Sequence, residues 1–140
     1  MSEFIQRDQY RRSDCDLSKN TIWINLTTLN LSSNWIRTEG ATALSENTTW
    51  TNLTTLNLYY NNKIGAEGAA ALSKNTSWTN LTTLNLTENS IGAKGVTALS
   101  KNTTWTNLTT LNLRSNGIDA EGATELSKNT IWTDLTNLWT

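Results

Sequence analysis

Few side chains of this chain are of the types that carry out catalysis. There is no histidine and only one cysteine, Cys15. The glutamates Glu39, Glu67 and Glu121 recur at matching positions, one in each of three predicted helices, so we expect them on an outer surface rather than converging on one point. Because the usual pairings of a nucleophile with a base are absent, the sequence predicts no catalytic residues and no enzyme activity.

Phosphate and metal sites can be judged by residue spacing. The glycine-rich segments 65–68 (GAEG) and 92–95 (GAKG) lack the Lys-Ser/Thr pair of a phosphate-binding loop, so they indicate turns and helix starts. With one thiol and no histidine, the chain has no spacing typical of metal ligands. The sequence therefore predicts no metal and no cofactor.

The chemistry that does recur is hydrogen bonding by asparagine. One skeleton, L-x-x-L-x-L-x-x-N-x-I, occurs four times, most clearly from Leu81 to Ile91. A carboxamide donates and accepts at once, so it can satisfy backbone groups that a turn leaves buried at the end of a strand. We therefore predict a structural ladder between neighbouring repeats, formed by Asn34, Asn61, Asn89 and Asn116.

The skeleton repeats every 27 or 28 residues, which is typical of a solenoid. Each unit starts with two-residue alternation, which favours a strand, and continues into a short helix-like segment. Because one helix connects each strand to the next, the strands are predicted to be parallel. Strands are predicted near residues 27–31, 54–58, 82–86, 109–113 and 136–138, and helices near 39–46, 67–74, 94–101 and 121–128.

Another asparagine column follows the predicted helices. Asparagine is the commonest substitute for glycine in the left-handed conformation that ends many helices. We therefore predict this conformation at Asn20, Asn47, Asn75, Asn102 and Asn129. The strict recurrence of tryptophan at one point of every unit predicts a core column made of Trp23, Trp50, Trp78, Trp105 and Trp132.

The domain organisation follows from the repeats. Residues 1–22 are predicted to be an N-terminal capping half-repeat, helical from about Arg7, with Phe4 and Ile5 as its apolar contacts. Residues 23–140 are predicted to hold four full units and a truncated fifth. No room is left for a second domain.

Composition bears on location and partners. Eleven Lys and Arg against twelve Asp and Glu leave a net charge of −1, which does not favour nucleic acid or an anionic membrane. No apolar run is long enough for a membrane span or a signal peptide. The many N-x-S/T triplets, such as those at Asn30, Asn52, Asn80 and Asn107, lie in or beside predicted strands, where glycans would obstruct a sheet. We therefore expect a cytoplasmic protein.

The motif L-x-x-L-x-L-x-x-N-x-I-G-x-x-G-A, clearest at residues 81–96, resembles the leucine-rich-repeat family, specifically its ribonuclease-inhibitor-like class. The resemblance covers about residues 23–138. It implies an α/β fold, a right-handed leucine-rich-repeat solenoid with a curved parallel β-sheet inside and short helices outside. Members of that class serve as inhibitors, immune-receptor sensors and GTPase-regulator scaffolds, so the resemblance implies protein binding without naming a ligand.

Positions that differ between the repeats are the candidates for binding. Four of them, Tyr59, Tyr60, Glu88 and Arg114, are predicted to form a strip on the sheet face, and aromatic and arginine side chains are frequent binding hot spots. Trp35 and Trp139 are expected near the same side. The alternative is unselected drift at exposed positions.

A structural role is the second functional hypothesis. The last strand leaves an edge that is open to pairing, and the sequence predicts an exposed apolar layer beside it unless another surface covers it. The chain would then self-associate or form part of a longer array. The residues of this predicted C-terminal edge are Leu126, Trp132, Leu135 and Leu138.

Overall fold

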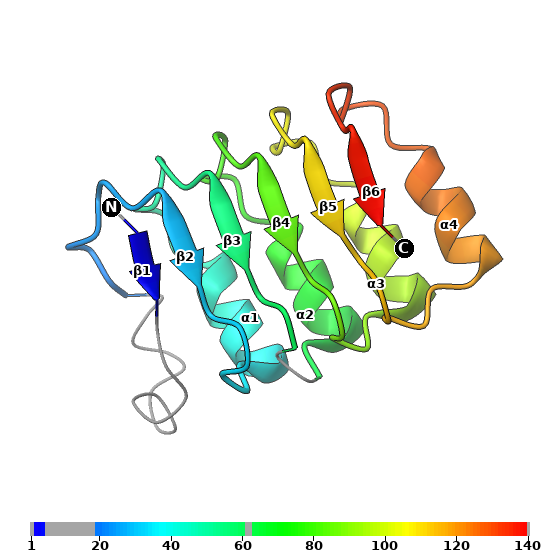
Figure 1. Cartoon of the computed structure of the whole chain (residues 1–140), viewed down its shortest axis with the longest axis horizontal. Helices are drawn as coiled ribbons and strands as arrows, with labels where there is room; N and C mark the ends of the chain where they lie inside the picture. Colours follow the sequence, from blue (N-terminus) through cyan, green and yellow to red (C-terminus); the bar gives the residue numbers. More distant parts are fainter. Residues whose placement is uncertain (1, 5–18, 61–62, 140) are drawn as a thin grey trace.

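A computed structural model describes residues 2–4, 19–60 and 63–139 (Figure 1). Six strands form one parallel sheet in chain order, and the helices lie along one side of it. The strands are β1 (Ser2–Phe4), β2 (Thr28–Asn30), β3 (Thr55–Asn57), β4 (Thr83–Asn85), β5 (Thr110–Asn112) and β6 (Asn137–Trp139). The helices are α1 (Arg37–Ser45), α2 (Gly65–Leu72), α3 (Gly92–Leu99) and α4 (Ala120–Ser127).

The predicted solenoid is confirmed. Each strand pairs in parallel with the next, and equivalent residues stand opposite each other, as Leu56 does with Leu84. Strands β2 to β5 are shorter than predicted, since only the segment Thr-Leu-Asn of each lies within the sheet. The strand predicted at 136–138 lies one residue later, at Asn137–Trp139. Within that segment the leucine is buried and its two neighbours are partly exposed, which is the alternation expected of a strand with one covered face.

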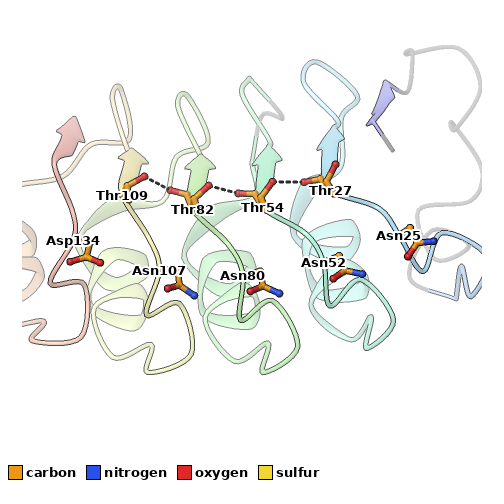
Figure 2. Close-up of a pocket in the computed structure, with 9 residues that line it drawn as sticks. All are labelled: Asn25, Thr27, Asn52, Thr54, Asn80, Thr82, Asn107, Thr109 and Asp134. Carbon is orange, nitrogen blue, oxygen red and sulfur yellow. Dashed lines mark hydrogen bonds between the residues drawn. The ribbon is translucent and has the colours of Figure 1, made fainter.

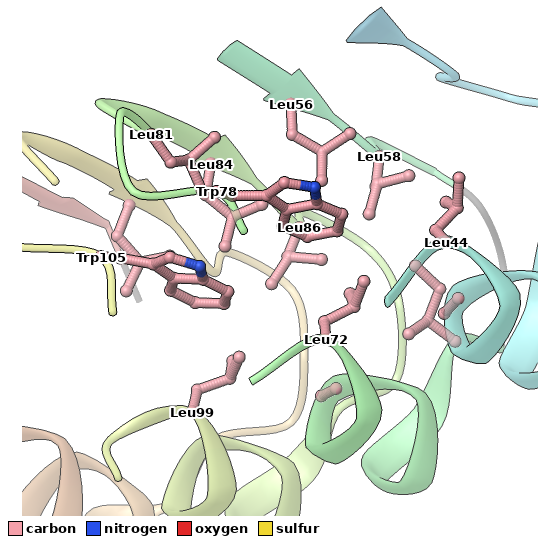
Figure 3. Close-up of a cluster of buried hydrophobic side chains, with 14 of the residues drawn as sticks. Leu44, Leu56, Leu58, Leu72, Trp78, Leu81, Leu84, Leu86, Leu99 and Trp105 are labelled. Atoms are coloured by element: carbon pink, nitrogen blue, oxygen red, sulfur yellow. The ribbon is translucent and has the colours of Figure 1, made fainter. Parts of the chain in front are cut away.

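The leucines and tryptophans of successive repeats form one continuous core between the sheet and the helices (Figure 3). Trp50, Trp78 and Trp105 are completely buried, so the predicted tryptophan column is a core column there. Trp132 stacks on Trp105 with ring centroids 6.5 Å apart, whereas Trp23 at the other end is only partly buried. Because each layer covers the next, the order of one repeat depends on its neighbours.

Glycine allows the helices to pack closely. A Cβ atom added to Gly95 of α3 would overlap the Ile91 side chain and would lie 3.1 Å from Cα of Ala66 in α2. An added Cβ on Gly68 of α2 would meet Ile64 of its own repeat and Ala41 of α1 in the same way. The neighbouring helices therefore approach through a glycine in each repeat, in addition to the small residues Ala41 and Ala69.

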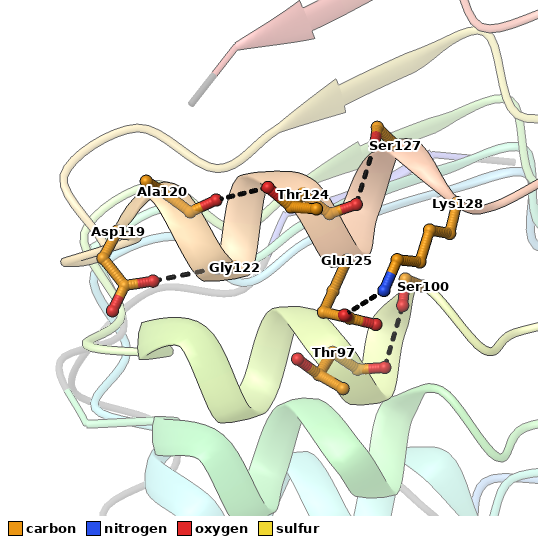
Figure 4. A network of polar contacts seen from close by, with 9 residues as sticks. All are labelled: Thr97, Ser100, Asp119, Ala120, Gly122, Thr124, Glu125, Ser127 and Lys128. Carbon is orange, nitrogen blue, oxygen red and sulfur yellow. Dashed lines mark hydrogen bonds and ion pairs between the residues drawn. The ribbon is translucent and has the colours of Figure 1, made fainter.

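All four helices begin earlier than predicted, α1 to α3 by two residues and α4 by one. α1, α2 and α3 follow Ile36, Ile64 and Ile91, which are buried and cannot cap a helix with a side chain. Burial of the isoleucine fixes each start, which explains why no capping residue marks it in the sequence. Only α4 has a side-chain cap among the described helices, with Asp119 Oδ1 accepting from the Gly122 N–H at 2.9 Å (Figure 4).

The prediction of left-handed residues after the helices is wrong. The residues at the helix C-termini, such as Glu46 and Ser100, are right-handed, and none of the described asparagines that follow has a positive φ. Left-handed backbone lies instead in the loops from strand to helix. The non-glycine residues with positive φ in the described part are Ser33, Trp35, Arg37, Tyr60, Lys63, Glu88, Ser90 and Ser115.

The N-terminal end holds a strand that the repeats did not predict. Residues 2–4 form β1, which pairs with β2 along the whole of its length. The helix predicted from Arg7, together with Ile5 and Cys15, lies outside the described residues. None of the helices in the described part is both long enough and apolar enough to cross a bilayer.

Candidate functional site

The turn that follows each strand is shaped by the last strand residue. The side-chain oxygens of Asn30, Asn57 and Asn112 accept a hydrogen bond from the N–H two residues further on, at 3.0 to 3.2 Å. Asparagine favours such local bonds to its own backbone. The same bond in each repeat sets the first exposed loop residues at equivalent places, which is how Tyr59 and Arg114 come to share one column.

Backbone pairing continues past the strands into these loops. The N–H of Tyr60 donates to the Thr87 carbonyl at 2.9 Å, and the N–H of Glu88 donates to the Arg114 carbonyl at 3.0 Å. The structure therefore aligns Tyr59 and Tyr60, then Glu88, then Arg114 in the loops of three successive repeats. We call these four residues the loop strip.

Aromatic side chains dominate one end of this region. Tyr59 and Tyr60 are 39% and 44% exposed, and their ring centroids are 5.9 Å apart. Trp35, in the corresponding loop of the first repeat, is 43% exposed, unlike the buried tryptophans of the core. The backbone of Trp139 lies opposite Asn112 within the sheet, so this residue precedes the loop position rather than joining it.

The post-strand asparagines form hydrogen bonds between repeats. Asn116 Nδ2 donates to the carbonyls of Leu113 and Arg114 in its own repeat and, at 2.9 Å, to Leu86 in the preceding one. Its Oδ1 accepts from the N–H groups of Asn89 and Ile91, also in the preceding repeat. Both ends of the carboxamide therefore join neighbouring loops.

Asn89 and Asn34, from the same column, have different hydrogen-bond partners. Asn89 is buried, and its Nδ2 donates to Leu58 of the preceding repeat at 2.8 Å. Asn34 is buried and donates to the Ser32 carbonyl at 3.1 Å. Asn61 lies outside the described residues.

The post-helix asparagines form a second set of bonds that the sequence analysis missed. Asn102 Oδ1 accepts from the N–H groups of Thr104 and Trp105, and its Nδ2 donates to the Ser73 carbonyl of the preceding repeat at 2.8 Å. Asn75 makes the same pattern with its own turn and with Ser45. The spacing of asparagine to tryptophan, always three residues, was the signal in the sequence.

A shallow groove of about 730 Å³ crosses the loops that lead into the strands (Figure 2). In the middle repeats its threonine hydroxyls donate to the preceding repeat, as Thr82 does to the Thr54 carbonyl at 3.0 Å. The exposed Asn107 likewise donates to Thr79. Because these donors already bond to carbonyls of the preceding repeat, we assign the groove a structural role.

The predicted apolar layer at the C-terminal end is only partly exposed. Leu126 and Trp132 are buried, 5% and 7% exposed, because they pack into the core and Trp132 stacks on Trp105. Leu135 is partly buried. The expectation of exposure is therefore wrong for Leu126 and Trp132, whereas Leu138 is 44% exposed.

Parallel strands in register, one outer helix per unit and inter-repeat asparagine bonds define a protein of the α/β repeat-solenoid class. A family model described as Leucine Rich repeat matches residues 24–45, 51–73, 79–100 and 106–127. These segments make up more than half of the chain, which belongs to the leucine-rich-repeat family. A comparison with curated proteins found no match.

Proposed function

We propose that the chain is a non-catalytic protein-binding scaffold whose binding surface is the loop strip together with Trp35. Leucine-rich repeats commonly mediate protein binding, and the proposal assigns that role to particular side chains. The main support is one observation: the exposed aromatic residues Trp35 and Tyr60 have left-handed backbone conformations, which are unfavourable for large side chains.

Trp35 and Tyr60 both have φ of 57°. A non-glycine residue in the left-handed region costs roughly 1 kcal/mol, and bulky residues are rare there. In later repeats the equivalent positions hold smaller or more flexible residues: Gly117 corresponds to Trp35, and Glu88 and Ser115 correspond to Tyr60. Strained residues concentrate where function requires them, so the presence of two large aromatic side chains at these positions supports recognition over drift.

The test is affinity capture with the variant Tyr59→Ala/Tyr60→Ala. Loss of the two aromatic residues is expected to weaken partner binding by at least about thirtyfold, because even one hot-spot residue contributes about 2 kcal/mol or more. Ser115→Ala is the matched control, since Ser115 occupies the Tyr60 position of the fourth repeat and is also exposed. Thermal melts must show that all variants fold. Equal recovery of partners by parent and double variant would favour drift.

A second candidate function is self-association through the outer edge of β6. It is favoured by the exposure of Leu138 on the last described strand, which has a pairing neighbour only on its β5 side. Light scattering tests it. A dimer abolished by Leu138→Lys supports this function, and a monodisperse monomer argues against it.

We also propose that the chain belongs to the ribonuclease-inhibitor-like class of leucine-rich repeats and that it is a cytoplasmic protein. One helix of eight or nine residues per repeat supports the ribonuclease-inhibitor-like class. Glu39, Glu67 and Glu121 lie exposed in separate helices, which supports a non-catalytic role. A cytoplasmic location is supported by Asn75 and Asn102, which stand in N-x-S/T triplets but are buried, so a glycan on either would break the post-helix bonds.

A further inference from the structure

The charges on the outer helices differ between repeats. α1, α2 and α4 carry a glutamate in the first turn, at Glu39, Glu67 and Glu121, but α3 carries Lys94 at that position. Lys101 follows the end of α3, and α3 itself has no acidic residue. The third repeat is thus the one described unit whose helix surface is purely basic, in a chain with a net charge of −1.

A furrow of about 320 Å³ lies on this surface between α2 and α3. Its charged lining residues are Lys74, Lys94 and Lys101, and the methyl groups of Ala70 and Ala98 contribute to the walls. In the described residues these three amines form no ion pair. On α4, by contrast, Lys128 pairs with Glu125 (Figure 4). The furrow therefore concentrates positive charge that no carboxylate in contact offsets.

The furrow also contains the hydroxyl group of Thr97, which lacks the intrahelical hydrogen bond made by the equivalent threonines. Thr42 of α1 and Thr124 of α4 donate to the carbonyl four residues earlier, at 2.9 and 2.8 Å. Thr97 holds the equivalent position in α3 and lines the furrow, but among the described residues its hydroxyl donates to no carbonyl (Figure 4). It can donate to a ligand.

We propose that this furrow binds an extended acidic segment of a protein, separately from the loop strip. Lys94 and Lys101 are seven residues apart, about 10 Å if the helical rise continues past Leu99 to Lys101, so two separate anionic groups can each meet one lysine. An extended chain of the polyproline type has three residues per turn and rises about 3.1 Å per residue, so every third side chain faces one way at intervals of about 9 Å. Carboxylates at that spacing match the lysines.

The probe is a fluorescent heptapeptide with glutamate at its first, fourth and seventh positions, followed by anisotropy at low salt. The Lys94→Glu variant, which restores the residue of the other helices, is expected to bind roughly thirtyfold more weakly because an attraction becomes a repulsion. Lys128→Gln is the matched control, since Lys128 is paired and lies outside the furrow, and it is expected to change affinity by less than about twofold.

Lys101→Gln provides an independent variant and is expected to weaken binding about fivefold. Circular dichroism melts check that each variant is folded. Equal affinity of the parent and Lys94→Glu, or an equal loss with Lys128→Gln, would overturn the proposal. Displacement of the peptide by inorganic phosphate at equal concentration would overturn the assignment to an extended segment, because a single anion would then suffice.

Discussion

The two buried asparagine columns use the same side chain in different ways. After the strands, Asn116 directs both its oxygen and its nitrogen toward the preceding repeat. After the helices, Asn102 uses its oxygen to hold its own turn and only its nitrogen to reach the preceding repeat. Asn116 therefore makes most of its side-chain hydrogen bonds to the neighbouring repeat, whereas Asn102 makes most of its own within one repeat.

This difference reflects what each turn leaves unpaired. The loop from strand to helix contains left-handed residues, and its backbone groups have few local partners. The turn from helix to tryptophan needs acceptors for two successive N–H groups, which one carboxamide oxygen supplies. Repeat proteins gain stability from each unit and from each interface between units, so Asn116 contributes mainly to an interface and Asn102 mainly to its own unit.

The largest effect is expected for Asn116→Leu. It leaves the Leu113 carbonyl and the N–H groups of Asn89 and Ile91 without their side-chain partner, while the Leu86 carbonyl keeps a hydrogen bond from Asn89 Nδ2. At about 1 kcal/mol or more for each of these three buried groups, the free energy of unfolding should fall by about 3 kcal/mol or more. Urea melts measure it.

The measured loss in free energy of unfolding for Asn116→Leu can contradict the role assigned to the post-strand bonds. A loss below about 1 kcal/mol would mean that the post-strand bonds have little net value, since even one unpaired buried group costs about that much. The slope of the melt must stay constant for the comparison to hold, because a changed slope would indicate that the variant unfolds in separate parts.

Much of the fold could be predicted because its signal is repeated. Four copies of one skeleton indicated parallel strands and an outer helix, and equivalent residues such as Leu56 and Leu84 do pair in one register. β1 was missed because its three residues carry no part of the skeleton. The post-helix asparagines were misread because a preference for left-handed backbone and a capacity for local hydrogen bonds belong to the same residue type.

Parts of the candidate sites could not be seen in the sequence. The left-handed backbone at Trp35 and Tyr60 is hidden because neither residue is a glycine or asparagine, which usually mark that conformation. Lys94 was visible as a charge reversal in a column of glutamates. Its meaning depended on which side chains α2 and α3 bring together, and that needs the packed helices.

A smaller effect is expected for Asn102→Leu. Two N–H groups, of Thr104 and Trp105, and the Ser73 carbonyl lose a partner, and only the last bond crosses to another repeat. The expected loss is about 2 kcal/mol, because only the bond to the Trp105 N–H is fully buried and water can partly replace the other two. Native-state hydrogen exchange sharpens the comparison, since the loss of protection should centre on the turn at 102–105, whereas Asn116→Leu should also expose amides of the preceding repeat. Identical exchange patterns would remove the distinction.

The smallest effect is expected for Asn107→Leu, which tests whether burial rather than bond count determines these losses. Asn107 also donates to the preceding repeat, with Nδ2 2.9 Å from the Thr79 oxygen, but it is exposed. Water can replace the lost donor, so the change should stay within about 0.5 kcal/mol. A loss as large as that of Asn102→Leu in the same urea melts would show that bonds between repeats have value wherever they lie, and the contrast between the two buried columns would then need another cause.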